Sequence, residues 1–301
     1  MTDSLYISSD SSNTLYKRLE FKERNRNGVV KSSTTPHTQK IDLFNAAMDT
    51  ARTIKNSYDK ANAVIDVADE MIKAGRNKNK IISVLLEALE IAKTIEDPYE
   101  QAWCVDEIAS FMGRIGFDRN ELSNILKENF KTTRAIEDPY YKARCIIGAV
   151  HVMVESGLSK NEIYNVLNEV MEIAKIVEDS TDNDRGEIIT AISSLITEAK
   201  LDKNKAYELF KRALIIARTI EHPLYKAITL CYIAFQMAKT GYYIGGINKV
   251  FVEALEVAKT IEDSADKGGF ICDEVSEMKK AGLNKNEINA IFKEAGIEPP
   301  K

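Results

Sequence analysis

The segment IEDPYEQAWCVDEIASFMGRIGFDRNELSNILKENFKTTRAIEDPY, residues 95–140, decides the fold, because it opens and closes on the same five letters. An apolar residue recurs at the start of this motif along the chain, at Ile54, Ile95, Ile136, Val177, Ile220 and Ile261. The intervals are 41, 41, 41, 43 and 41 residues. Since a steady period of this length is typical of stacked supersecondary units, the sequence predicts a repeat protein in place of one or two ordinary globular domains.

Each repeat carries the signals that start and end two helices. In the second repeat Asp97 stands as an N-cap, Pro98 occupies the first helical position, and Glu100 is placed to close a capping box. A residue suited to a left-handed C-cap ends the first helix, in the column Gly75, Gly116, Gly157, Ala199, Gly241 and Gly282. New N-caps follow at Asn77, Asp118, Ser159, Asp202 and Asn284, and further boxes are expected through Glu121, Glu162 and Glu287.

Apolar residues within a repeat have helical spacing. Ala143, Ile146, Val150 and Met153 follow one another at intervals of 3, 4 and 3 residues, which places them on one helix face. The predicted fold is therefore all-α, built from antiparallel pairs of a first helix (helix A) and a second helix (helix B). A lone helix B around residues 44–54 precedes six such pairs, so about thirteen helices are expected. Because one pair cannot bury its apolar face alone, stability has to come from stacking.

The first 38 residues differ from the remainder. We therefore predict a tail over residues 1–38 and a helical repeat domain over residues 39–301. The tail is rich in Ser, Asn and Thr and holds six Lys/Arg and four Asp/Glu. We expect it to be mostly disordered, because it has too little apolar surface to offset chain entropy. The alternative is that this slightly basic segment folds back on the acidic repeat domain or binds a partner.

Composition excludes several classes of function. The net charge of −5 argues against sequence-independent binding of nucleic acid, which needs a surplus of Lys and Arg. Four cysteines lie far apart without a metal-binding spacing, at Cys104, Cys145, Cys231 and Cys272, and are expected to be reduced core thiols. No apolar run is long enough for a membrane helix, and the first residues do not resemble a secretory signal. These features predict a cytoplasmic protein without metal or cofactor.

Part of helix B matches a known family. Ala206, Phe210 and Ala213 have the small–Phe–small spacing of tetratricopeptide repeats, so the array over residues 41–296 resembles a tetratricopeptide-like superhelix. The family's period is about 34 residues, its closing proline comes earlier than Pro223, and its Trp and Leu-Gly signature is absent here. HEAT-like α-solenoids are the neighbouring architecture. The resemblance implies a right-handed α-solenoid that binds protein or peptide on a concave face lined by A helices, and it transfers no binding residue.

A basic residue ends every helix B. The column is Arg52, Lys93, Arg134, Lys175, Arg218 and Lys259. These charges suit the negative end of the helix dipole, so we interpret them as C-terminal capping groups. The alternative is a row of binding charges.

The candidate partner-binding residues lie on the A-helix face opposite the apolar stripe, where polar side chains are expected. They are Trp103 and Glu107 in the second repeat, Arg144 and His151 in the third, and Tyr232 and Phe235 in the fifth. Exposed aromatic residues beside arginine are typical anchors of binding surfaces. The alternative is that they pack against neighbouring helices.

Two turns break the pattern. The turn before the fourth helix A contains Asp182, Asp184 and Gly186, which faintly resemble a calcium loop but lack its later ligands. In the fifth repeat, residues 242–246 (YYIGG) replace the usual cap. These turns are interpreted as a capping loop and as either a local distortion or a contact loop.

The motifs of catalysis are missing. The three histidines occupy different repeat positions, and there is no P-loop, no GxGxxG after a strand and no HExxH. We therefore expect a non-enzymatic scaffold that binds a protein or peptide partner. The alternatives are a non-catalytic subunit of a larger enzyme or sensor complex and, behind it, a helical-repeat nucleic-acid binder. A homo-oligomer formed through end-to-end contacts between copies is a further alternative.

Overall fold

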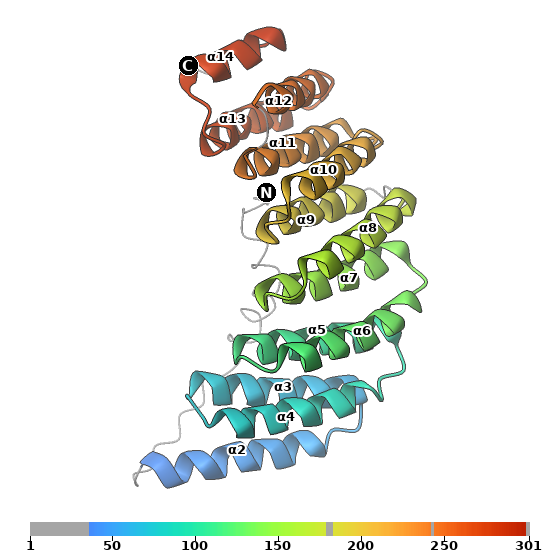
Figure 1. Ribbon diagram of the computed structural model, residues 1–301, viewed down its shortest axis with the longest axis vertical. Helices are drawn as coiled ribbons and strands as arrows, with labels where there is room; N and C mark the ends of the chain where they lie inside the picture. The colour runs from blue at the N-terminus through green and yellow to red at the C-terminus, as the bar shows by residue number, and fades with distance from the viewer. Residues whose placement is uncertain (1–35, 179–182, 242–243, 299–301) are drawn as a thin grey trace. The chain divides into compact units, whose positions relative to one another are not determined.

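The computed structural model describes residues 36–178, 183–241 and 244–298. Residues 50–301 form one compact unit. Within the described residues every regular element is a helix, and there are thirteen (Figure 1). They are α2 (Pro36–Arg52), α3 (Ser57–Lys73), α4 (Lys78–Ala92), α5 (Pro98–Arg114), α6 (Arg119–Arg134), α7 (Pro139–Glu155), α8 (Lys160–Ile176), α9 (Asp184–Glu198), α10 (Lys203–Ala217), α11 (Pro223–Lys239), α12 (Ile244–Ala258), α13 (Ser264–Lys280) and α14 (Lys285–Glu294).

The all-α prediction and the order of the helices are confirmed. Odd-numbered helices from α3 to α13 are the predicted A helices, and even-numbered ones are the B helices. Helix α2 already begins at Pro36, slightly before the predicted boundary at residue 39. The rest of the predicted tail, residues 1–35, lies outside the described residues.

The predicted turn chemistry is present at most junctions. The Asp97 side chain accepts a hydrogen bond from the Glu100 backbone N–H at 2.8 Å, and Pro98 begins α5. Gly116 ends that repeat's helix A with a φ of +69°, which is the left-handed conformation that glycine adopts without strain. In the fourth repeat the left-handed residue is Lys200, with a φ of +47°, and the placement at Ala199 is wrong. The interval from Gly157 to Lys200 is 43 residues, so both extra residues of this repeat precede the left-handed position.

The capping boxes are fewer than predicted. Among the described caps, only Asn284 and Glu287 complete one, with the Asn284 backbone N–H donating to Glu287 Oε2 at 2.7 Å. Ser159 caps α8, but its expected partner Glu162 forms an ion pair with Lys127 of α6 at 2.8 Å. A charged partner on the preceding helix B therefore competes with the local backbone for this glutamate.

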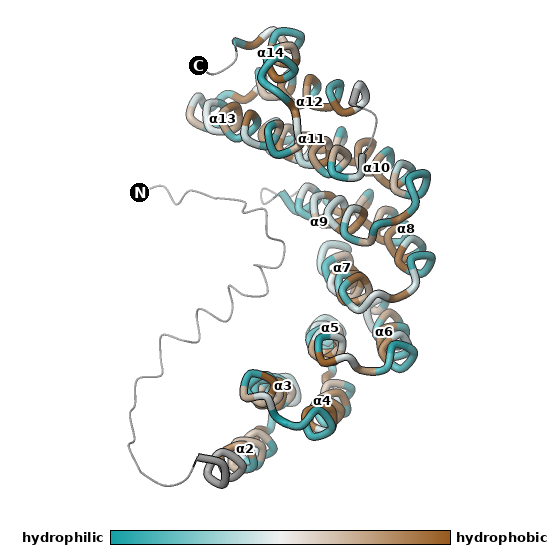
Figure 2. The backbone as a smooth tube through the Cα atoms, turned by 60° about the vertical axis from the view of Figure 1, so that its left-hand side comes forward, coloured by the Kyte–Doolittle hydropathy of each residue, from teal (hydrophilic) through white to brown (hydrophobic). Residues whose placement is uncertain are grey.

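Two kinds of packing hold residues 50–301 together. Each helix A from α3 to α11 packs against the helix B that follows it, successive A helices from α3 to α13 also pack against one another, and the last helix B, α14, packs on α12. Apolar residues recur along the helices at the helical spacing (Figure 2). The largest fully buried side chains include a phenylalanine in each of three B helices, namely Phe210, Phe251 and Phe292. Phe210 belongs to the small–Phe–small pattern, so at this position the pattern marks the core.

The basic residues that end the B helices do not act as simple caps. The guanidinium groups of Arg52, Arg134 and Arg218 each bind both oxygens of a glutamate 35 residues later, on the next helix B, with distances of 2.7–3.1 Å. Lys93 and Lys175 instead pair with Glu90 and Glu172 on their own helices. The capping interpretation is therefore incomplete for the arginines, which stand at the ends of these helices and also bind a carboxylate across the junction. The groups are exposed, so each pair contributes at most about 1 kcal/mol.

The other B helices end differently. A side chain from the next helix A caps the last carbonyl: Gln101 Nε2 donates to Lys93 O, Arg185 Nη2 to Val177 O and Lys267 Nζ to Lys259 O, at 3.1, 2.6 and 2.9 Å. Arginine bridges thus follow α2, α6 and α10, and side-chain caps follow α4, α8 and α12. For the arginines that end a helix B and for these side-chain caps the junctions alternate, although a further arginine, Arg212 of α10, pairs with Glu172 of α8 across a capped junction.

Candidate partner-binding surface

Four aromatic side chains gather at the first turns of α5 and α7, and we call Tyr99, Trp103, Tyr140 and Tyr141 the aromatic cluster. The ring centroids of Tyr99 and Tyr141 are 4.9 Å apart with an edge-to-face tilt of 61°. Trp103 and Tyr140 extend the contact at 6.3 and 5.4 Å from Tyr99 and Tyr141, respectively. Edge-to-face rings at these distances attract one another, so the cluster links two successive A helices.

The local sequence explains why the rings meet. Asp97–Pro98 and Asp138–Pro139 start α5 and α7 in the same way, and the Asp138 side chain accepts from the backbone N–H groups of Tyr140 and Tyr141. The tyrosines therefore stand on two capped first turns, and α5 packs against α7. Tyr99 rests on the buried residues Ala102, Ile136 and Cys145. Tyr141 is 45% exposed, so the cluster has a buried base and an open side.

A polar chain borders the aromatic cluster and reaches the next helix A. Arg144 Nη1 donates to the Tyr140 hydroxyl at 2.9 Å, and that hydroxyl donates to Glu187 Oε2 of α9 at 2.9 Å. Burial raises the pKa of Tyr140, with Arg144 opposing the rise and Glu187 adding to it. The phenol therefore stays protonated and can serve as donor and acceptor at once.

His151 lies further along α7, between two glutamates. Its Nε2 is 3.2 Å from Glu155 Oε1, and its Nδ1 is 3.7 Å from Glu198 Oε2 of α9. Glu198 raises the pKa of His151 most, burial opposes the rise, and Glu155 adds to it. The half-buried imidazolium therefore links α7 and α9.

Tyr232 and Phe235 lie at a different junction, between α9 and α11. The Tyr232 hydroxyl is 2.6 Å from Ser194 Oγ, which also accepts from Gln236 Nε2 at 3.4 Å. Phe235 is only 4% exposed and has the Lys239 ammonium 4.5 Å from its ring centroid. The prediction that Phe235 belongs to an exposed binding face is therefore wrong, since the side chain packs into the helix junction. Tyr232 is half-buried and uses its hydroxyl within the protein.

Among the predicted site residues, Trp103 and Arg144 lie at opposite ends of one chain of contacts, which runs through Tyr99, Tyr141 and Tyr140. Glu107 is half-buried one turn beyond Trp103 on α5, and His151 is nearly two turns beyond Arg144 on α7. The sequence interpretation missed Tyr99, Tyr140 and Tyr141. The signal was present as tyrosine directly after Asp-Pro, but that motif was interpreted as helix punctuation alone.

A buried polar pair lies beside this surface. Asn129 Nδ2 of α6 donates to Asp106 Oδ1 at 2.9 Å and to the Ala102 carbonyl at 3.1 Å. Burial raises the pKa of Asp106 well above its ordinary value, and the hydrogen bond from Asn129 opposes the rise. A Cβ atom on Gly148 of α7 would lie 3.1 Å from Asp106 Oδ2, which means that the glycine leaves room for this carboxyl.

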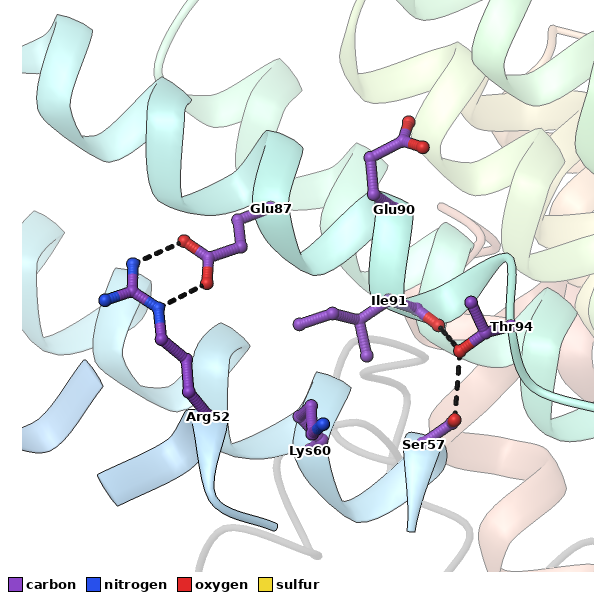
Figure 3. A pocket seen from close by; sticks show the side chains of 7 residues that line it. All are labelled: Arg52, Ser57, Lys60, Glu87, Glu90, Ile91 and Thr94. Atoms are coloured by element: carbon purple, nitrogen blue, oxygen red, sulfur yellow. Dashed lines mark hydrogen bonds and ion pairs between the residues drawn. The ribbon is translucent and has the colours of Figure 1, made fainter. Parts of the chain in front are cut away.

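The surface also has two grooves at equivalent repeat positions. The first, shown in Figure 3, contains the Arg52–Glu87 pair and a bond from Thr94 Oγ1 to Ser57 Oγ at 2.9 Å, and Lys60, Glu90 and Ile91 complete its lining. The second is lined by Glu221, Pro223, Lys226, Glu253, Glu256, Val257 and Thr260. Each groove lies beside an arginine bridge: Arg52–Glu87 lies in the first, and Glu253 of the second pairs with Arg218.

Other predicted features are placed as follows. Three of the four free cysteines are buried as predicted, whereas Cys272 of α13 is exposed. In the described residues no group of three or more His, Cys, Asp or Glu side chains is arranged to hold a metal ion. Asp184 begins α9, while Asp182 and residues 242–243 lie outside the described ranges. None of the described helices combines the length and apolar character needed to cross a bilayer.

The chain was compared with known proteins. No family model and no curated protein matches it. Among solved structures it is similar to Ton1535 from Thermococcus onnurineus NA1, with 13% identity over 86% of this chain and 96% of that chain and a TM-score of 0.44. It is also aligned with a structure described as the DHF58 filament, with 15% identity over 86% and 88% of the two chains and a TM-score of 0.13. These scores are too low to decide fold or function.

Proposed function

We propose that this protein is a non-enzymatic scaffold, a right-handed tetratricopeptide-like α-solenoid that binds a segment of a partner protein along its A helices. The recurring A–B helix pairs and the packing of successive A helices support this architecture. Stacked A helices present an extended surface of the kind that repeat proteins use for binding. Three buried free thiols fit a reducing compartment, so we place the scaffold in the cytoplasm.

The observation that carries the proposal is the open side of the aromatic cluster. Large aromatic side chains next to arginine dominate the energy of many protein interfaces, since they bury much area for little loss of side-chain entropy. In the described contacts the Trp103 indole N–H and the Tyr141 hydroxyl have no hydrogen-bond partner. They are therefore donors that a partner's backbone carbonyls can use.

The shape of the cluster favours an extended peptide. Its rings follow one another across α5 and α7, and the line continues through Arg144 and Glu187 to α9. An extended segment that crosses these helices places an apolar side chain on the rings and a polar group near Arg144. The binding unit proposed here therefore spans the second to fourth repeats.

Binding can be tested with a displayed library of random peptides selected against the full chain. We expect enrichment of sequences whose affinity falls about tenfold or more in Trp103→Ala and in Tyr141→Ala, because truncating an aromatic anchor removes much of the interface energy. Tyr207→Ala is the matched control, since Tyr207 is an exposed tyrosine on α10 away from the cluster. Melting temperatures of all variants separate binding from unfolding.

Two results would sink the proposal. One is a library that yields no enriched peptide. The other is a set of peptides that bind the wild type, Trp103→Ala and Tyr141→Ala equally well while all three proteins are folded.

A further inference from the structure

Helix α13 is held to the array by few side chains. It buries three residues, Phe270, Glu274 and Met278, whereas the preceding helix A, α11, buries nine. A carboxylic acid thus occupies the middle of a small apolar anchor.

The position of Glu274 is apolar in other repeats. Glu274 stands four residues before Met278, and a methionine occupies the equivalent position of other A helices, at Met71, Met112, Met153 and Met237. The residues four before these methionines are Val67, Ile108, Ala149 and Ile233, and all of them are buried. Glu274 is itself only 1% exposed. Neither of its carboxyl oxygens has a hydrogen bond of normal geometry, and the weak donor Cys231 Sγ is the one group that favours the charged carboxyl. Burying an ionised carboxylate without a partner is strongly unfavourable, so this environment selects the protonated form.

The neighbouring groups offer no compensating positive charge. Helices α11 and α12 pack against α13. From α11 the Cys231 thiol faces the carboxyl, α12 supplies no charged group that acts on it, and Glu277 of α13 itself acts unfavourably. Asp273 and Glu277 also act on the Cys231 thiol. Burial raises the pKa of Glu274 to about 8, with Glu277 adding to the rise and Cys231 opposing it.

We propose that Glu274 makes the docking of α13 on α11 a pH-sensitive latch, which is closed while the carboxyl carries a proton and opens when the proton is lost. Opening frees the carboxylate to reach water. It also uncovers the apolar side chains of Phe270 and Met278 and the thiol of Cys231.

The direction of the effect follows from linkage. The docked pKa is about 8, and the ordinary value that applies once the side chain is in water is 4.5. Docking is therefore strongest below the ordinary value, weakens through the interval between the two values, and levels off above the docked one. One titrating proton limits the change to about tenfold in the docking equilibrium per pH unit.

Amide hydrogen exchange of the full chain tests the latch. We compare wild type with Glu274→Gln at each pH from about 5 to about 8.5, since the amide mimics the neutral acid and the intrinsic pH dependence of exchange cancels. In peptides from α13, exchange of the wild type relative to the variant should rise with pH by up to about tenfold per unit. Asp273→Asn removes an exposed carboxylate of the same helix and should behave like wild type.

The latch is overturned if wild type and Glu274→Gln show the same pH dependence in α13. It is equally overturned if peptides from α3 change with pH as much as those from α13, because the transition is then global unfolding. Should Glu274→Gln fail to fold, Glu274→Leu restores the apolar character of the column and provides the pH-independent comparison.

Discussion

Large apolar side chains of the B helices are fully buried at some positions and exposed at others, and sequence position alone does not distinguish the two. Phe251 in α12 is fully buried, whereas Leu86 in α4 is 42% exposed. Phe251→Ala should lower the free energy of unfolding by about 3–5 kcal/mol, because it removes a buried ring and leaves a cavity. Leu86→Ala should change it by about 0.5 kcal/mol or less. Urea unfolding of both variants measures the difference, and equal effects would mean that the phenylalanine column is not the core.

His151 gives a pH dependence at the residue scale. Glu198 is the main cause of its raised pKa, so the charged form is favoured in the folded state. The stabilising contribution is complete below the unfolded pKa and is lost as pH rises through the folded pKa. His151→Gln should therefore destabilise the protein at about pH 6 and have a smaller effect at about pH 8. Because Glu274 also titrates, the informative quantity is the difference in melting temperature between wild type and variant at each pH. A difference that grows with pH would contradict the assignment.

Helix starts connect stability to the proposed binding surface at the scale of elements. Asp138 caps α7 beneath Tyr140 and Tyr141, and Asp118 caps α6 in the same way. Asp138→Ala and Asp118→Ala should each reduce stability by about 0.5–2 kcal/mol. Of these two variants, only Asp138→Ala should also weaken binding of a selected peptide, since Asp118 does not cap a helix that carries the aromatic cluster. Calorimetric titration of both variants checks this, and equal peptide affinities would separate the cap from the surface.

The arginine–glutamate bridges connect one helix B to the next, and their energy can be measured. A double-mutant cycle of Arg134→Ala and Glu169→Ala should give a coupling energy of about 0.2–1 kcal/mol that declines with salt, because both groups are largely exposed. A coupling that is absent at low salt would show that the alternation between bridged and capped junctions has no energetic consequence.

Features that depend on neighbouring residues could be predicted from the sequence, whereas features that depend on contacts between distant residues could not. Helix caps and apolar columns are local patterns, so the A–B order, the N-caps and the core phenylalanines were predictable. The Arg52, Arg134 and Arg218 bridges join residues 35 positions apart, and no local rule distinguishes them from helix-dipole charges. The aromatic cluster was found only in part, since Trp103 broke a polar column while Tyr99 and Tyr140 sat inside a familiar turn motif. Phe235 was misplaced because the wheel of one helix does not show what the next helix A covers.

Repeat organisation makes a prediction about the whole molecule. If each pair of helices contacts only its neighbours, a local defect spreads over a short distance. Phe292→Ala in α14 should accelerate amide exchange in α12 to α14 and leave α3 and α4 close to wild type. Uniform acceleration along the chain would instead indicate one cooperative globular unit.

The proposed scaffold function requires that a peptide binds at the aromatic cluster. Amide hydrogen exchange of the full chain, with and without a saturating selected peptide, locates the bound surface. We predict new protection in the first turns of α5 and α7, extending to the start of α9. Protection confined to the B helices, or no protection anywhere at saturation, would contradict the claim.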